Sequence, residues 1–320
     1  MNGEVSIPVV DLADPAGPNS VRSDLLAAYS NVGFAYLVGH EISEDLIGRV
    51  FEASRRFHNM PMARKLAIEL NHIHRGYIAI GTSTDRNSDL AHITKPNQSA
   101  SFIMMREAGP QDADVQSGAY LAGPNQWPEL DGFREVLEEY NSAMVDLASR
   151  VIDMFARVLG DDGGVIARAF ETPTTWLRLL HYPPATGADK ELYGSAPHVD
   201  FGAITILAQD DVGGLQVQTV EGEWIDVPHR AGALVMNTGE MLRRWSNGRL
   251  LATPHRVINR SGRERYSCPF FFDPNVDTVV KPLPSCIDDS PPKTIEPVEY
   301  GTWLRNELQA GYARHSTPNT

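Results

Sequence analysis

The sequence predicts a mainly β fold, a sandwich or jelly roll, with helices flanking the β core. Short runs of β-branched and aromatic residues, separated by turn signals, follow one another from residue 176 to residue 272. The longest helical pattern of the chain precedes them, at residues 128–159. No Pro- or Ser-rich linker separates the helical first half from the strand-rich second half, so we expect one compact unit.

Two short strands and a helix are expected at the start of the chain. The apolar run from Ile7 to Leu12 has Pro8 near its beginning, which is typical of an edge strand because proline lacks a backbone N–H. Apolar residues then recur at helical spacing over residues 20–32, and Gly33 ends that helix. Residues 34–38 predict the second strand.

A second helix and a long loop follow. The helix is expected to begin at Ser43, because acidic residues come directly after it and the helix dipole favours them there, and to end before Pro61. Residues 82–125 form a connection longer than ordinary loops, and such loops often act as lids or binding loops. His72 and His74 have the spacing of a metal-binding pair. We interpret them as surface or turn histidines, since no further ligand has suitable spacing nearby.

The second half of the chain alternates strands with turns. A short helix is expected at residues 165–170, after glycines that end the long helix. Asn247-Gly248 is the pair that tight β-hairpins favour. Strands are expected at residues 176–182, 203–208, 214–218, 224–227, 233–237, 249–258 and 266–272.

These patterns divide the single unit into four regions. We expect an N-terminal region of helices, edge strands and a loop or lid at 1–125, and backing helices at 126–171. The β core follows at 172–280, and a C-terminal segment with a helix and a polar tail at 281–320.

Composition limits the classes of partner. The net charge of −13 repels nucleic-acid phosphates and anionic membranes, so we expect neither as a partner. Only Cys268 and Cys286 could form a disulfide, which favours a reducing compartment. The N-terminus lacks a secretory pattern, and no stretch approaches the roughly 20 apolar residues of a membrane helix. We expect a cytoplasmic monomer or homodimer that binds a small molecule.

A candidate metal site lies in the β core. His198 and Asp200 are two positions apart, so at the end of a strand both side chains share one face. Such a pair arises by chance about once in two chains of this composition. His255, inside a later strand-like run, offers a third ligand. Two histidines and one carboxylate, with the remaining metal positions open, are typical of non-haem Fe(II) oxygenases.

A candidate carboxylate anchor follows ten residues later. On a strand, Arg265 and Ser267 face the same side, so a guanidinium fork and a hydroxyl can meet one carboxylate. Tyr182, before Pro183-Pro184, offers a further hydroxyl.

Several motifs together resemble the isopenicillin N synthase-like family of Fe(II)/2-oxoglutarate-dependent dioxygenases. The N-terminal half is similar to that family in Ile7-Pro-Val-Val-Asp11 and Gly33-Phe-Ala-Tyr-Leu-Val-Gly-His40. The C-terminal half resembles it in Leu177-Arg-Leu-Leu-His-Tyr-Pro-Pro184, His198-Val-Asp200, Gly213-Gly-Leu-Gln-Val217, Asn237-Thr-Gly-Glu240, Trp245-Ser-Asn-Gly248, His255-Arg-Val257 and Arg265-Tyr-Ser267.

The resemblance implies a double-stranded β-helix, or jelly-roll, core with Fe(II) held by His198, Asp200 and His255. It also implies that Arg265 and Ser267, helped by Tyr182, bind the distal carboxylate of 2-oxoglutarate. With O2, such enzymes convert 2-oxoglutarate to succinate and CO2 while they oxidise a substrate C–H bond. Hydroxylation, desaturation, ring closure, epoxidation and demethylation are all outcomes within the family. By analogy, we expect hydroxylation of a secondary metabolite.

Six residues are candidates for the substrate pocket because they flank the motif strands or lie in the long loop. They are Phe102, Met104, Arg178, Phe201, Phe270 and Phe272. Arg178 faces the same way as Tyr182 by period-two counting, so it is expected either to meet a polar or anionic substrate or to form a structural salt bridge.

Two alternatives remain open at this point. An oxidase of the same family would use Arg265 and Ser267 to hold its own substrate and would need no 2-oxoglutarate. The C-terminal segment 310–320 lacks the glutamine that such synthases carry near the terminus. A non-catalytic binding protein on the same scaffold would be expected to have a broken ligand set, whereas this set is complete.

Overall fold

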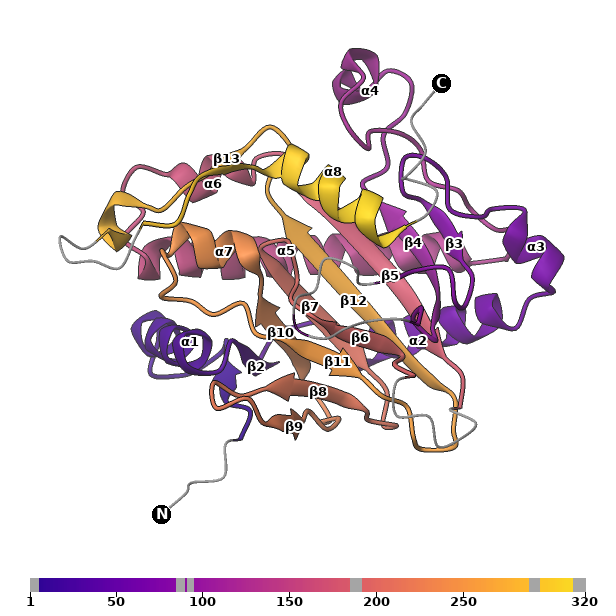
Figure 1. Cartoon of the computed structure of the whole chain (residues 1–320), viewed down its shortest axis with the longest axis horizontal. Helices are drawn as coiled ribbons and strands as arrows, with labels where there is room; N and C mark the ends of the chain where they lie inside the picture. The colour runs from indigo at the N-terminus through magenta and orange to yellow at the C-terminus, as the bar shows by residue number, and fades with distance from the viewer. Residues whose placement is uncertain (1–5, 85–89, 91–94, 185–191, 288–293, 313–320) are drawn as a thin grey trace.

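The structure of the chain is a computed structural model. Two β-sheets pack face to face in it, with an apolar cluster between them (Figure 1). The structure describes residues 6–84, 90, 95–184, 192–287 and 294–312. In spatial order, the larger sheet contains β1 (Val9–Asp11), β2 (Phe34–Val38), β10 (Leu234–Thr238), β7 (Ile204–Gln209), β12 (Arg265–Asp273), β5 (Thr174–Tyr182), β4 (Ala100–Met105) and β3 (Gly76–Ile78). The smaller sheet contains β6 (Ser195–His198), β11 (His255–Val257), β8 (Leu215–Gln218) and β9 (Trp224–Asp226).

Three helices support the larger sheet. They are α1 (Pro18–Asn31), α2 (Glu44–His58) and the 26-residue α5 (Phe133–Val158). Figure 1 shows α5 running behind the sheet, and its buried apolar stripe packs into the same core as strands β7 and β12. The shorter helices are α3 (Met62–Leu66), α4 (Ala113–Ser117), α6 (Val165–Ala169), α7 (Glu240–Trp245), a 3₁₀ turn (Pro284–Cys286) and the C-terminal α8 (Tyr300–Gly311). Strands β13 (Val279–Val280) and β14 (Val298–Glu299) pair separately.

Side chains alternate between two cores along the larger sheet, as the period of a strand requires. On β5, Leu177 and Leu179 join the core under the helices, whereas Leu180 and Tyr182 join the apolar cluster between the two sheets. This second cluster includes Val217 and Val257 from the smaller sheet, so the two sheets close around it. Tyr182, one of the candidate site residues, therefore lies between the two sheets.

The predicted fold class is confirmed, with differences in detail. The helix expected from Ser43 begins there, because the Ser43 side chain accepts a hydrogen bond from Leu46 N at 3.2 Å. The hairpin expected at Asn247-Gly248 is wrong. Both residues have positive φ, 50° and 84°, but they follow the unpredicted helix α7 and precede a segment without strand structure. The Asn-Gly pair supplied the left-handed backbone for a helix end instead of a strand turn.

The long connection at 82–125 is not one loop. It contains strand β4, which is paired with β5, and the short helix α4. The segments 85–89 and 91–94 lie outside the described residues, as does the polar tail expected at the C-terminus, because description ends at residue 312.

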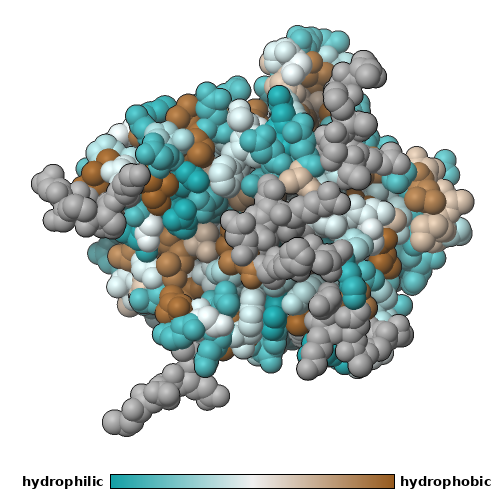
Figure 2. Space-filling view, in the orientation of Figure 1, coloured by the Kyte–Doolittle hydropathy of each residue, from teal (hydrophilic) through white to brown (hydrophobic). Residues whose placement is uncertain are grey.

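Three further observations concern the cysteines, the surface and the helices of the described residues. Cys268 and Cys286 are both buried and free, so they form no disulfide. On the face shown in Figure 2, apolar residues lie in small patches between hydrophilic ones. Within the described ranges, no helix combines the length and apolar character needed to cross a bilayer.

Candidate active site

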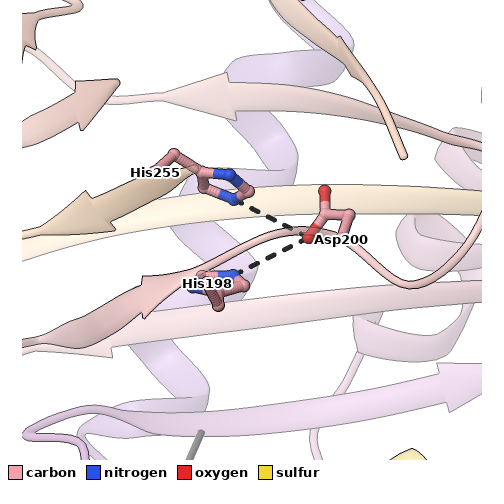
Figure 3. Close-up of side chains that lie close together, drawn as sticks. All are labelled: His198, Asp200 and His255. Carbon is pink, nitrogen blue, oxygen red and sulfur yellow. Dashed lines mark ion pairs between the residues drawn. The ribbon is translucent and has the colours of Figure 1, made fainter. Parts of the chain in front are cut away.

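His198, Asp200 and His255 come together at one end of the smaller sheet. Strands β6 and β11 are antiparallel neighbours, and their register places His255 opposite His198. Asp200 follows two residues after His198, beyond the end of β6. Their ligand atoms lie within 4.8 Å of one another, and Figure 3 shows the three side chains pointing toward a common centre. Asp200 Oδ1 is 3.7 Å from His198 Nε2 and 3.6 Å from His255 Nε2.

The backbone orients both imidazoles. His198 Nδ1 lies 2.7 Å from the Ala196 carbonyl oxygen, and His255 Nδ1 lies 3.1 Å from the Thr253 carbonyl oxygen. A carbonyl accepts only, so Nδ1 carries the proton and the lone pair of a neutral ring is left on Nε2. A hydrogen bond from Nδ1 to a backbone carbonyl is common in metal-binding histidines, because it orients the ring so that Nε2 can bind the metal.

Asp200 is held by two hydrogen bonds on the oxygen that faces away from the histidines. Asn237 Nδ2 donates to Oδ2 at 2.7 Å, and the Thr205 hydroxyl donates to the same oxygen. Burial acts to raise the pKa of Asp200, but the imidazoles of His255 and His198 and the two hydrogen bonds outweigh it and lower that pKa. The carboxyl is therefore ionised, as a metal ligand must be. Two imidazoles and one carboxylate fit Fe(II).

The expected carboxylate anchor lies on the facing sheet. Arg265 and Ser267 are both about 1% exposed, and Arg265 Nη1 donates to Ser267 Oγ at 3.3 Å. Arg265 Nε donates to the Gly213 carbonyl oxygen at 2.7 Å, which fixes the plane of the guanidinium. Tyr182 is paired with Arg265 across β5 and β12, and its ring lies 4.7 Å from the guanidinium carbon. A cation, a hydroxyl and a phenol are thus assembled at one place.

A cavity of about 400 Å³ lies beside these groups. The residues that line it include the metal cluster members His198 and Asp200, and Tyr182 of the anchor. The site-facing positions of β5, namely Trp176, Arg178, Leu180 and Tyr182, form one wall. A cavity of this size suits a small molecule.

Two of the six pocket candidates line this cavity, Arg178 and Phe201. The other four do not. Phe102, Met104, Phe270 and Phe272 are at most 2% exposed and belong to the core beneath the helices. Phe102, for example, packs against Phe57 and Phe133, with ring centroids 5.2 and 5.1 Å apart.

Strand parity explains this outcome. Arg265 and Ser267 face the site, so the odd positions of β12 face it and the even positions 270 and 272 face the helices. Phe271, which was not a candidate, lines the cavity. Counting in twos from Arg265 identifies it from the sequence alone.

Other cavity residues come from segments that local patterns did not connect to the site. Of the two histidines expected at the surface or in a turn, His72 is exposed, whereas His74 lies in the turn before β3 but is buried and lines the cavity. The end of the chain contributes Trp303 and Glu307 of α8 and the following Tyr312. Their place in the cavity wall depends on how α8 folds back over the core (Figure 1).

Comparison with protein families agrees with this geometry. Residues 173–274 match the 2OG-Fe(II) oxygenase superfamily. Residues 7–130 match the N-terminal model described as non-haem dioxygenase in morphine synthesis.

Individual relatives extend the match over nearly the whole chain. The 2-oxoglutarate-Fe(II) type oxidoreductase hxnY of Emericella nidulans is 36% identical, over 88% of this chain and 82% of that protein. A homoarginine-6-hydroxylase of Arabidopsis thaliana is 33% identical, over 95% and 93% of the two chains. A full-length Neurospora crassa protein, solved in complex with alpha-KG, superposes with a TM-score of 0.83 at 27% identity, over 97% and 98%. The chain therefore belongs to the 2OG-Fe(II) oxygenase superfamily and is an Fe(II)- and 2-oxoglutarate-dependent dioxygenase.

Proposed function

We propose that the chain hydroxylates a C–H bond of a small secondary metabolite, with Fe(II) held by His198, Asp200 and His255. The observation that supports this most directly is the convergence of the three ligand atoms within 4.8 Å. Two of these ligands, His198 and Asp200, line the cavity that also contains Arg178 and Phe201. When bound, the iron would supply the reaction of O2 with 2-oxoglutarate that yields succinate, CO2 and an oxidised substrate. The protein's part is to bind, orient and exclude water.

Arg265, Ser267 and Tyr182 would bind the distal carboxylate of 2-oxoglutarate. The guanidinium is buried and its plane is fixed by the Gly213 carbonyl, so little conformational freedom would be lost when it meets a carboxylate. Charge-assisted hydrogen bonds of this kind are roughly twice as strong as neutral ones. The anchor would therefore orient the co-substrate with its other end toward the histidines.

The substrate class rests on relatives and on composition. Relatives include the 2-oxoglutarate-dependent dioxygenase citB of Monascus ruber, 38% identical over 87% of each chain, and the clavatol oxidase claD of Penicillium crustosum, 32% identical over 98% of each. We infer a small-molecule substrate, no nucleic-acid or membrane partner, a cytoplasmic location, and a monomer or homodimer. The acidic composition supports the exclusion of polyanionic partners.

The internal division into 1–125, 126–171, 172–280 and 281–320 also stays a proposal. The strand-rich third region contains all three proposed metal ligands and the anchor.

Succinate formation tests the proposed function. Protein reconstituted with Fe(II) without oxygen is supplied with 2-oxoglutarate and air across a metabolite library, and succinate is measured. We expect substrate-dependent succinate from the wild type and none above background from His198→Ala. Substrate oxidation that needs no 2-oxoglutarate would contradict the proposal in favour of an oxidase. Absence of turnover, with metabolites bound equally by the wild type and His198→Ala, would contradict it in favour of a binding protein.

A further inference from the structure

Arg178 lies on β5 between Tyr182 of the proposed co-substrate anchor and Trp176, and all three residues line the cavity. On β5 the site-facing residues follow in the order Tyr182, Leu180, Arg178 and Trp176. Four residues of strand separate Arg178 from Tyr182 by about 13 Å. A five-carbon co-substrate anchored beside Tyr182 and directed at the metal would not also occupy Arg178, so this arginine faces the space left for the substrate.

The guanidinium of Arg178 has donors to spare. Its Nη2 donates to Ser101 Oγ at 3.0 Å, and this is the one hydrogen bond that it makes with the described residues. Its Nε is buried and has no hydrogen-bond partner in the same set of residues. No described carboxylate pairs with it, so the structural salt bridge considered from the sequence is not formed in this part of the chain. A cation at the edge of a buried site without a counterion is costly unless a ligand supplies the charge.

The other charged groups of the cavity do not compete for this role. Glu240 is ion-paired with Arg243 at 2.7 Å and with Arg244 at 3.0 Å. Asp200 belongs to the metal cluster, and Glu307 forms no ion pair with Arg178 among the described residues. Arg178 is therefore the cationic side chain that the described cavity wall offers to a ligand.

Aromatic side chains surround the space beyond Arg178. Trp176 lies next to Phe201 and Phe271, with ring centroids 5.5 and 6.1 Å away. The His74 ring packs edge-on against Trp176 and against Tyr312, with ring centroids 5.1 and 4.8 Å apart. These rings form one continuous wall drawn from five separate segments. Flat apolar faces of this kind suit stacked or edge-to-face contact with a ring.

From these observations, and resting on the proposed function, we propose that the substrate is a small aromatic carboxylate. Its carboxylate would accept hydrogen bonds from the Arg178 guanidinium, and its ring would pack against the wall of Trp176, Phe201 and Phe271. One guanidinium matches a single negative charge. A cavity of about 400 Å³ that must also receive the co-substrate leaves room for one or two rings.

Matched acids and amides test this assignment. The probes are benzoate, phenylacetate and trans-cinnamate with their carboxamides, titrated without oxygen into the complex of Fe(II), 2-oxoglutarate and protein. We expect at least one acid to bind about 10-fold more tightly than its amide, equivalent to about 1.4 kcal/mol. Arg178→Met, which keeps side-chain length without charge, should remove this preference. Arg178→Lys should keep only part of it, because an ammonium lacks the planar fork.

Two further variants control the experiment. Arg157→Met removes an exposed arginine of α5 and should keep the full preference. Ser101→Ala removes the hydroxyl that orients Arg178 and should reduce the preference without abolishing it. It also provides a second test if Arg178→Met does not fold, as judged by its thermal unfolding.

The outcomes separate the two proposals. Equal binding of acid and amide by the wild type, no binding of any aromatic acid, or an unchanged preference in Arg178→Met would overturn the substrate class. Binding of 2-oxoglutarate that requires Fe(II) and is lost in His198→Ala would leave the proposed function standing in each of those cases. Failure of the wild type to bind 2-oxoglutarate would instead reject the proposed function.

Discussion

The two faces of the eight-stranded sheet are made from the same strands but have different chemistry. On β12, the face between the sheets presents Arg265 and Ser267, whereas the face beneath the helices presents Cys268, Phe270 and Phe272. The helix-side face joins a large continuous apolar core. The site-side face combines a smaller apolar cluster with polar groups that bond one another.

This difference shows that adjacent residues of one strand can serve different purposes: one packs in the core that stabilises the fold, and the next faces the site. Because side chains alternate along a strand, a polar residue can point into the site while its neighbour completes the core. Substitutions at adjacent positions of one strand should therefore have different consequences. The predictions below test that separation.

The largest effect on activity is expected at His255, which lies on the smaller sheet and faces the site-side face of the larger sheet. His255→Ala removes one of three proposed ligands, so we expect activity to fall to the level of metal-free protein. Iron content after reconstitution, measured together with succinate formation, checks this. His72→Ala, an exposed histidine, should keep wild-type iron content. Full iron occupancy in His255→Ala would contradict the assignment.

Adjacent phenylalanines compare the two faces directly. Phe270→Ala empties a fully buried position under the helices and should lower the free energy of unfolding by about 3–5 kcal/mol. Phe271→Ala removes a partly buried ring from the cavity wall and should cost clearly less stability. Urea unfolding of both variants gives the comparison, and equal losses would show that the two faces are not separated as described.

A smaller and more selective effect is expected at the proposed co-substrate anchor. Arg265→Ala should raise the concentration of 2-oxoglutarate needed for half-maximal activity by about 10- to 100-fold, because it removes charge-assisted hydrogen bonds worth about 1.5–3 kcal/mol. Iron affinity should change far less. Arg263→Ala is the matched control, since Arg263 lies two residues away but is exposed and pairs with Asp211 at 3.4 Å. Unchanged 2-oxoglutarate saturation in Arg265→Ala would reject the anchor.

Much of the fold and the metal end of the site could be predicted from the sequence. His255 lies in a run that was expected to be a strand, and Arg265 directly precedes another. Two-residue spacing predicts that His198 and Asp200 share a face, as do Arg265 and Ser267. Helix α7 was missed because its six residues are too few for a helical period to stand out, and Asn247-Gly248 beside it favoured a hairpin.

The rest of the cavity wall was less predictable because segments that are distant in the sequence assemble it. His74, Trp303 and Tyr312 come from a turn and from the C-terminal end of the chain, and no local pattern indicates that these segments meet. Phe271 is different. The alternation that placed Arg265 and Ser267 already implied that Phe271 faces the site and that Phe270 does not.

The smallest effect concerns a histidine on the helix side of the sheet. Burial lowers the pKa of His58 to about 3, assisted by nearby His181 and Lys65, although the Leu179 carbonyl at 3.0 Å opposes the shift. The unfolded chain, with an ordinary pKa near 6.5, binds a proton that the folded chain does not, so stability is lost as pH falls below about 6.5. The cost at pH 5 should be about 2 kcal/mol.

His58→Gln, which keeps an N–H donor but cannot titrate, tests this effect. The free energy of unfolding, measured from pH 7.5 to pH 5, should fall less steeply in the variant than in the wild type. His181, whose pKa burial also lowers, remains in both proteins. His72→Gln, at an exposed position, should follow the wild type. Parallel curves for His58→Gln and the wild type would show that His58 takes up its proton in the folded chain as readily as in the unfolded one, and that this face tolerates a buried charge.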